Sequence, residues 1–162
     1  MELEIRPLDE TDITATARIH QAAFVRQTMS KEWIECNSKA YPRIQYFVAE
    51  KSPNEIVGYI QWSQKSGFRP EVVIELEQLA VLPEFHGNGI GTRLINESLQ
   101  QLNRQLAIRG ATIKHILVTT RADNYAQQLY TKTLGAEVEV TIRDLYSADE
   151  VLMIARNVSV QL

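Results

Sequence analysis

The sequence has little of what builds disulfide-rich, membrane-spanning or nucleic-acid-binding proteins. Its 162 residues include a single cysteine, Cys36, which excludes an intramolecular disulfide and a cysteine-based zinc or iron–sulfur site. No run of about 18 apolar residues could span a membrane, and the acidic N-terminal segment lacks the features of a secretory signal peptide. The 17 Lys and Arg against 20 Asp and Glu leave a net charge of −3, which argues against a nucleic-acid partner. We expect a cytoplasmic protein without a membrane or nucleic-acid partner.

The remaining composition is that of an ordinary globular protein. Hydrophobic residues make up 44% of the chain and charged residues 23%, close to average usage. The length fits one domain, and the sequence contains no internal repeat, low-complexity tract or linker. We therefore predict a single domain over residues 1–162.

Hydrophobic periodicity and turn residues predict eleven helices and strands. Strands are expected over residues 2–8, 45–50, 56–64, 72–82, 113–119, 136–146 and 151–156. Helices are expected over residues 13–24, capped by Thr11 or Asp12, from residue 30 to before Pro42, from residue 90 to a stop at Gly110, and over residues 124–134. Asn124 with Gln127 has the form of a capping box. This order predicts a mixed α/β (α+β) sheet.

A glycine-rich turn connects the strand over residues 72–82 to the longest helix. Its sequence is His86-Gly87-Asn88-Gly89-Ile90-Gly91-Thr92. Glycines let backbone N–H groups approach a ligand closely, and a helix N-terminus favours an anion such as phosphate or pyrophosphate. A tight connection without a ligand is the alternative.

Two common nucleotide-binding motifs do not fit this turn. A dinucleotide fingerprint G-x-G-x-x-G counted from Gly87 has Thr92 at its last position, and the following strand lacks the acid that would bind a ribose. A Walker P-loop would need a further glycine followed by lysine, and neither is present. A nucleotide-binding α/β domain is therefore disfavoured.

Two separated motifs resemble those of the GNAT superfamily of N-acetyltransferases. The segment from His86 to Gly91 resembles the acyl-CoA loop [QR]-x-x-G-x-[GA], with His in place of Gln or Arg, inside the longer match ELEQLAVLPEFHGNGIGTRLI. The segment ADNYAQQLYTKTLGAEVE resembles the second motif, in which Asn opens a helix that contains Tyr and ends at Leu-Gly. The resemblance covers about residues 74–139. It implies a GNAT-like fold, in which helices flank a central, mostly antiparallel sheet with splayed strands.

The resemblance also implies acetyl-CoA as cosubstrate, with no metal, and a set of residues that bind it. The loop residues Gly87, Asn88, Gly89, Ile90, Gly91 and Thr92 would cradle the CoA pyrophosphate with backbone amides, next to His86. Backbone groups of Leu79, Ala80 and Val81 would pair with the pantetheine arm, and Asn124 would contact the same arm. Core packing also explains Leu79 and Val81, and helix capping also explains Asn124. Both roles are compatible.

Acetyl transfer to an amine needs a base, because a primary amine with a pKa of about 10.4 is mostly protonated at pH 7. Glu75 and Glu77 lie two residues apart and so on one face of a strand. The resemblance favours Glu75 as the base, with Glu77 second. It also assigns Tyr130 to the protonation of the departing thiolate, which a phenol can perform. Solvated glutamates and a core tyrosine are the structural alternatives.

The expected function is transfer of an acetyl group from acetyl-CoA to a primary amine by direct transfer, with Glu75 as base and Tyr130 as acid. A catalytically silent acyl-CoA-binding sensor or partner module is the alternative. The acceptor is an amine of either a small molecule or a protein. Dimerisation is common in this family, so a homodimer is also considered.

Overall fold

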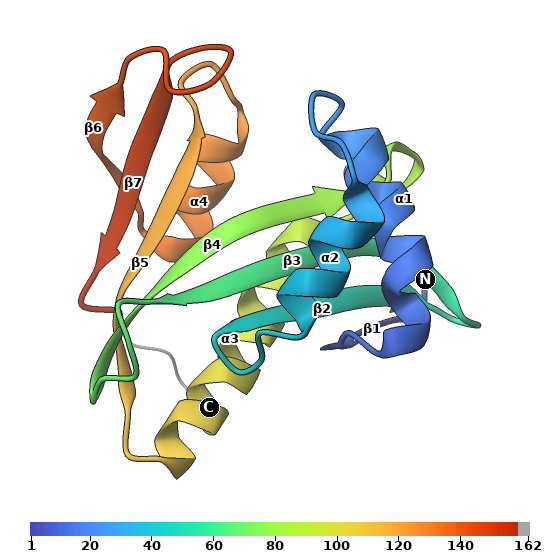
Figure 1. Cartoon of the computed structure of the whole chain (residues 1–162), viewed down its shortest axis with the longest axis horizontal. Helices are drawn as coiled ribbons and strands as arrows, with labels where there is room; N and C mark the ends of the chain where they lie inside the picture. The colour runs from blue at the N-terminus through green and yellow to red at the C-terminus, as the bar shows by residue number, and fades with distance from the viewer. Residues whose placement is uncertain (159–162) are drawn as a thin grey trace. The chain divides into compact units, whose positions relative to one another are not determined.

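The computed structural model describes residues 1–158. Their helices and strands follow one another in the predicted order (Figure 1). The helices are α1 (Ile13–Ala23), α2 (Ser30–Ser38), α3 (Ile90–Ile108) and α4 (Ala126–Leu134). The strands are β1 (Leu3–Pro7), β2 (Ile44–Lys51), β3 (Glu55–Lys65), β4 (Glu71–Val81), β5 (Thr112–Arg121), β6 (Glu137–Ile142) and β7 (Glu150–Arg156). The end of the predicted domain, residues 159–162, lies outside the described residues.

The strands form one sheet in the order β1-β2-β3-β4-β5-β7-β6. Strand β4 pairs with β5 in parallel, whereas β1–β2, β2–β3, β5–β7 and β6–β7 are antiparallel. The register of β4 with β5 ends at Leu76↔Val118, while β4 itself continues to Val81. The predicted mixed, mostly antiparallel sheet flanked by helices is therefore confirmed.

The chain divides into two compact units, which we describe separately. The first contains Met1–Ser63 and Gln78–Ser98, and the second contains Gln64–Glu77 and residues 99–158. Strands β3 and β4 and helix α3 each have residues in both units.

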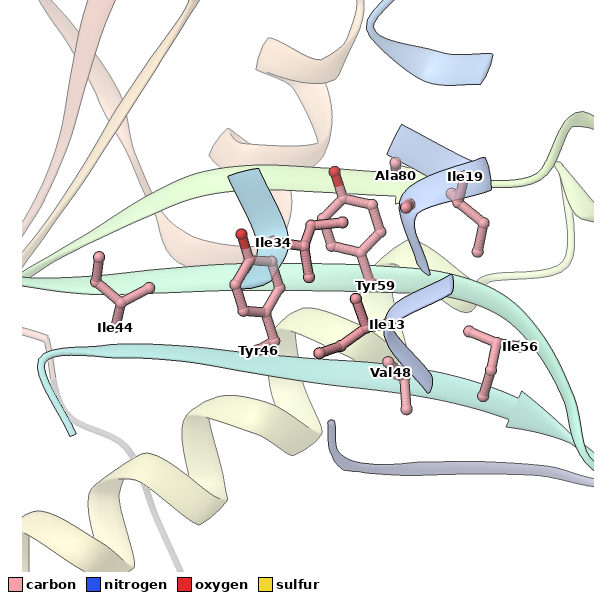
Figure 2. Packing of buried hydrophobic residues seen from close by; sticks show 10 residues of the cluster. Ile13, Ile19, Ile34, Ile44, Tyr46, Val48, Ile56, Tyr59 and Ala80 are labelled. Atoms are coloured by element: carbon pink, nitrogen blue, oxygen red, sulfur yellow. The ribbon is translucent and has the colours of Figure 1, made fainter. Parts of the chain in front are cut away.

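The core of the first unit joins α1 and α2 to β2, β3 and the end of β4. Figure 2 shows the buried side chains that meet there. They are Ile13, Ile19, Ile34, Ile44, Tyr46, Val48, Ile56, Tyr59 and Ala80. Elsewhere in this unit, Gly58 of β3 allows a close approach: a Cβ there would lie 3.0 Å from the Ala80 carbonyl oxygen and 3.3 Å from Leu94 Cδ1. Glycine therefore lets β3 pack directly against β4 and α3.

The core of the second unit is built on β5 and β7. Alternate residues of β5, Ile116 and Val118, are buried, as are Met153 and Ala155 of β7. The apolar stripe predicted for the long helix is confirmed in both units, because its members are all buried. These are Ile90, Leu94 and Ile95 in the first unit and Leu99, Leu102 and Leu106 in the second.

Two predicted caps are wrong in detail. Neither Thr11 nor Asp12 caps α1 with its side chain; Asp9 caps a preceding short 3-10 helix, and Asp12 accepts hydrogen bonds from Arg6 and from the backbone of Asp9. Asn124 does not form a reciprocal capping box, because the amide of Gln127 donates to the carbonyls of Arg121 and Ala122. The Asp12 side chain is engaged by Arg6 and Asp9, and the Gln127 side chain is engaged by the carbonyls of Arg121 and Ala122.

Candidate active site

The glycine-rich turn of the first unit leads from β4 into α3. A short 3-10 helix (Pro83–Phe85) ends β4, and α3 begins at Ile90. Gly87 and Gly89 have φ angles of 80° and 73°, and a Cβ on either would meet no atom within 4 Å. Glycine is therefore required here by backbone conformation and not by crowding. The turn presents open backbone to its surroundings.

Two side chains of this turn are used to hold its shape. The His86 ring donates from Nε2 to the carbonyl oxygen of Val81 over 2.8 Å, which ties the turn to the last residue of β4. The Asn88 amide donates to the carbonyls of Phe85 (3.0 Å) and His86 (3.3 Å). His86 and Asn88 therefore stabilise the turn, and its backbone N–H groups are available to a ligand.

The start of α3 supplies unpaired donors and partial positive charge. The Arg93 N–H closes the first helical bond to the Gly89 carbonyl over 3.1 Å. The N–H groups of Ile90, Gly91 and Thr92 precede it and have no intrahelical carbonyl to bond. Together with the helix dipole they form a place suited to an anion such as a pyrophosphate.

The strand segment before the turn has one buried and one accessible face. Ala80 is buried in the core, whereas Leu79 and Val81 are partly exposed. The Leu82 N–H that follows bonds to the Val57 carbonyl over 2.8 Å. The structure thus brings the predicted residues 79–81 and 86–92 together in the first unit.

The predicted residues Glu75, Asn124 and Tyr130 belong to the second unit. Glu75 is paired with Lys65 of β3, with 3.3 Å between its Oε1 and the lysine Nζ, and its side chain is 20% exposed. Glu77 is more exposed. Of the two glutamates, Glu75 is therefore the better buried.

Tyr130 lies on α4 and is 6% exposed. Burial raises the pKa of its phenol to about 12. Within residues 1–158 its hydroxyl makes no hydrogen bond. The hydroxyl thus stays protonated at neutral pH and has a proton available for a partner.

Asn124 has both ends of its amide engaged at the start of α4. Its Oδ1 accepts from the Ala126 N–H over 2.9 Å, and its Nδ2 donates to Thr120 Oγ1 over 3.0 Å. The helix-capping role expected as an alternative is thus present in the structure.

The sequence analysis did not single out a buried polar group in the first unit. Gln78 of β4 is 6% exposed and bonds to Tyr59, Trp33 and Gln27, and Gln27 in turn bonds to buried His20. The available signal was Gln78 itself, a polar residue on the buried face of an alternating strand. Burial lowers the pKa of His20, opposed by its bond to Gln27, and raises that of Tyr59 well above its usual value.

Other kinds of site find no support in the described chain. Residues 1–158 contain no group of three or more His, Cys, Asp or Glu side chains that could hold a metal ion. Within the same range, no helix is long and apolar enough to cross a membrane.

A strand that leads through a glycine turn into a helix N-terminus, in this sheet order, defines an acyl-CoA-binding fold. The model of the acetyltransferase (GNAT) family matches residues 13–136. The chain belongs to this family and is an acetyl-CoA-dependent N-acetyltransferase.

Several solved structures share this fold. The chain is similar to a structure of the NatC complex bound to Gag peptide and CoA, with TM-score 0.78, 18% identity and coverage of 96% of this chain and 99% of that chain. It is also similar to Ard1 from Thermoplasma volcanium, with TM-score 0.77, 18% identity and coverage of 98% and 100%. The ribosomal-protein-S18-alanine N-acetyltransferase from Escherichia coli gives TM-score 0.73, 21% identity and coverage of 99% and 97%. A comparison with curated protein sequences gives no significant match.

Proposed function

We propose that this enzyme transfers the acetyl group directly from acetyl-CoA to a primary amine, without an acetyl-enzyme intermediate. The observation that carries the proposal is the turn from Gly87 to Thr92, where two glycines at positive φ precede the unpaired N–H groups of α3. Such a turn fits a CoA pyrophosphate. Leu79, Ala80 and Val81 offer backbone to the pantetheine arm, and Asn124 contacts the arm in addition to capping α4.

The proposed chemistry assigns one proton transfer to each of two residues. Glu75 takes a proton from the ammonium form of the acceptor, directly or through water, and the neutral nitrogen attacks the thioester carbonyl. The carbon–sulfur bond then breaks, and the thiolate of CoA takes the phenolic proton of Tyr130. The attacking nitrogen loses its second proton, which returns through solvent to the Tyr130 phenolate, and Glu75 releases its proton to solvent. The accessible part of Glu75 and the protonated, unbonded hydroxyl of Tyr130 support these roles.

The test is thiol release from acetyl-CoA with a panel of amines that includes small amines, amino acids and peptides. We expect CoA and acetylated amine in equal amounts, and initial rates whose double-reciprocal lines intersect. Parallel lines together with an isolable acetyl-enzyme would contradict direct transfer. Stabilisation by acetyl-CoA without thiol release from any amine would identify a silent binding module instead.

The acceptor is an amine on either a small molecule or a protein. The similar structures cover both kinds by name, since one is a NatC complex bound to a Gag peptide and another an aminoglycoside 6'-N-acetyltransferase. The amine panel therefore contains both classes.

The single-domain organisation stays a prediction, supported by a family match that extends into both compact units.

Homodimerisation is also a prediction. The end strand β6 carries Glu137 and Glu139, and its register with β7 shifts between Val138 and Val140. Charges and bulges protect a strand edge from pairing, so we expect a dimer to use another surface.

A further inference from the structure

A chain of polar side chains crosses the first unit beneath the α1–α2 connection. It runs from Ser30 through His20, Gln27 and Gln78 to Tyr59 and Trp33, and we call it the Gln78 network. His20 and Tyr59 have no exposed surface, and Gln78 is 6% exposed. Gln27 alone belongs to an exposed segment and reaches inward from it.

The Trp33 indole, at one end of the Gln78 network, determines which atoms of the network donate and which accept. The Trp33 indole N–H can only donate, so the Gln78 atom 3.2 Å from it is the amide oxygen, which also accepts from the Tyr59 hydroxyl over 2.9 Å. The Gln78 NH₂ group therefore faces Gln27. It donates to Gln27 Oε1 over 3.3 Å.

The same logic continues to His20. Because Gln27 turns its oxygen inward, His20 Nε2, 2.9 Å away, must carry the ring hydrogen. His20 Nδ1 then accepts from the Ser30 hydroxyl over 2.7 Å. Each member has a defined donor or acceptor role, and the His20 ring is neutral.

The consequence is a fixed donor at the surface. With its oxygen held by two donors, the Gln27 amide points its NH₂ group away from the network, and within residues 1–158 that group makes no hydrogen bond. An immobilised donor loses little conformational entropy when a ligand binds. Gln27 is thus prepared to bind an oxygen atom of a ligand.

The position of Gln78 indicates which ligand. If the pantetheine arm pairs with Val81, Ala80 and Leu79, it runs away from the glycine turn, and its acyl end lies toward the next residue back, Gln78. Gln27 is held against that residue by a hydrogen bond.

We propose that the Gln27 NH₂ group binds a carbonyl oxygen of the acceptor, next to the amine that becomes acetylated. This inference rests on the proposed function and assigns a substrate class, α-amines with an adjacent carbonyl. Free amino acids and peptide N-termini share this chemistry. The residues His20 and Gln78 act as positioning residues through Gln27.

The test compares two acceptors of similar size and the same configuration, L-alaninamide and (S)-2-aminobutane, in which an ethyl group replaces the carboxamide and so removes the carbonyl oxygen. The quantity measured is the ratio of kcat/KM for alaninamide to kcat/KM for aminobutane. This ratio is compared between the wild type and each variant, so the difference in reactivity between the two amines cancels. In Gln27→Glu the inward oxygen is kept and the outward NH₂ becomes a carboxylate oxygen. We expect the preference for alaninamide to fall by roughly three- to tenfold, the effect of one lost hydrogen bond.

The matched control is Gln21→Glu, the same substitution at an exposed position of α1 outside the network. It should leave the preference unchanged. The inference would be overturned if Gln27→Glu lost activity equally on both acceptors, so that the preference did not change. It would also be overturned if the wild-type enzyme did not prefer alaninamide. A wild-type enzyme that acetylates no amine would instead overturn the proposed function, and the inference with it.

Two further measurements complete the test. Nitrogen NMR of His20 in the wild-type protein should show a neutral ring protonated at Nε2, and the opposite tautomer would overturn the network's direction. Comparison of L-alanine with a tetrapeptide that begins with alanine then distinguishes the two sources of the carbonyl group. Higher kcat/KM for the peptide supports an N-terminal acceptor, and higher kcat/KM for alanine supports a free amino acid.

Discussion

Tyr130 is a buried residue whose hydroxyl has no hydrogen-bond partner among residues 1–158. Buried phenols usually bond to a neighbour, but this one makes no hydrogen bond within residues 1–158, and burial raises its pKa to about 12. A buried group without a protein partner is suited to interact with a ligand atom. The leaving sulfur of CoA is the atom that the proposed mechanism supplies.

Tyr130→Phe should therefore reduce kcat and leave stability nearly unchanged. General acid catalysis contributes about 10²–10⁴-fold, so we expect kcat to fall by an amount in or below that range, with little change in acetyl-CoA affinity. Thiol release at saturating substrates, normalised to folded protein, measures the effect. A lower melting temperature with unchanged kcat would make Tyr130 a core residue only.

Glu75→Gln should lower turnover most at neutral pH and recover partly at alkaline pH, where the amine loses its proton without a base. The structure adds a competing partner, because Lys65 lies 3.3 Å from the same carboxylate. Lys65→Met is therefore a matched variant that removes the ion pair and keeps the base. Rates of each variant measured between pH 7 and 10 distinguish the two glutamates. A pH-dependent loss in Glu77→Gln and not in Glu75→Gln would identify Glu77 as the base. An equal loss at every pH in Glu75→Gln would indicate a structural role for Glu75.

At the scale of elements, the glycine turn depends on backbone conformation and on the α3 N-terminus together. Gly89→Glu should abolish stabilisation by acetyl-CoA, because it places bulk and negative charge where the pyrophosphate is expected. The wild-type protein should gain about 2.7 kcal/mol at a hundredfold excess of acetyl-CoA over its Kd. Thermal denaturation with and without acetyl-CoA measures this difference.

Gly110 offers a matched control for the strain of the substitution. It has the same φ of 73° as Gly89, and a Cβ at this position would also meet no atom within 4 Å, but it follows the C-terminal end of α3. Gly110→Glu should cost a similar 1–2 kcal/mol, roughly the penalty for a left-handed residue, and keep the full acetyl-CoA effect. Retention of that effect in a folded Gly89→Glu protein would remove the turn from the binding site.

At the scale of the whole molecule, the free energy of unfolding depends on pH through two buried groups, His20 at acidic pH and Tyr130 at alkaline pH. The pKa of His20 is lowered by burial from 6.5, so its contribution is present above pH 6.5 and is lost as pH falls below it. The pKa of Tyr130 is raised from 10 to about 12, so its contribution is present below pH 10 and is lost as pH rises toward 12.

We expect urea denaturation to show this pattern when each protein is compared with a non-titrating variant. The stability advantage of wild type over His20→Gln should shrink between pH 7.5 and 5.5. Relative to Tyr130→Phe, the stability of the wild-type protein should fall between pH 9.5 and 11. Advantages that do not vary with pH would show that neither group changes its pKa on folding.

The order of helices and strands, the apolar stripe of α3 and the glycine turn follow from the amino-acid sequence alone. These features depend on residues close together in the chain: apolar periodicity sets a helix face, and glycines with positive φ set a turn. The motif around residues 86–91 is also formed by neighbouring residues, so its resemblance to the acyl-CoA loop is enough to predict acetyl-CoA as the ligand.

The pairing of polar side chains that are distant in the sequence depends on the tertiary structure. Trp33 and Gln78 are 45 positions apart, and Gln27 and Gln78 are 51 apart, so no local pattern could predict the Gln78 network. The same holds for the Lys65–Glu75 pair and for Asp12, whose carboxylate accepts a hydrogen bond from Arg6 and does not cap α1. Strand pairing and helix packing bring these groups together, and a buried polar group takes the partner that packing provides, because burial without one is costly.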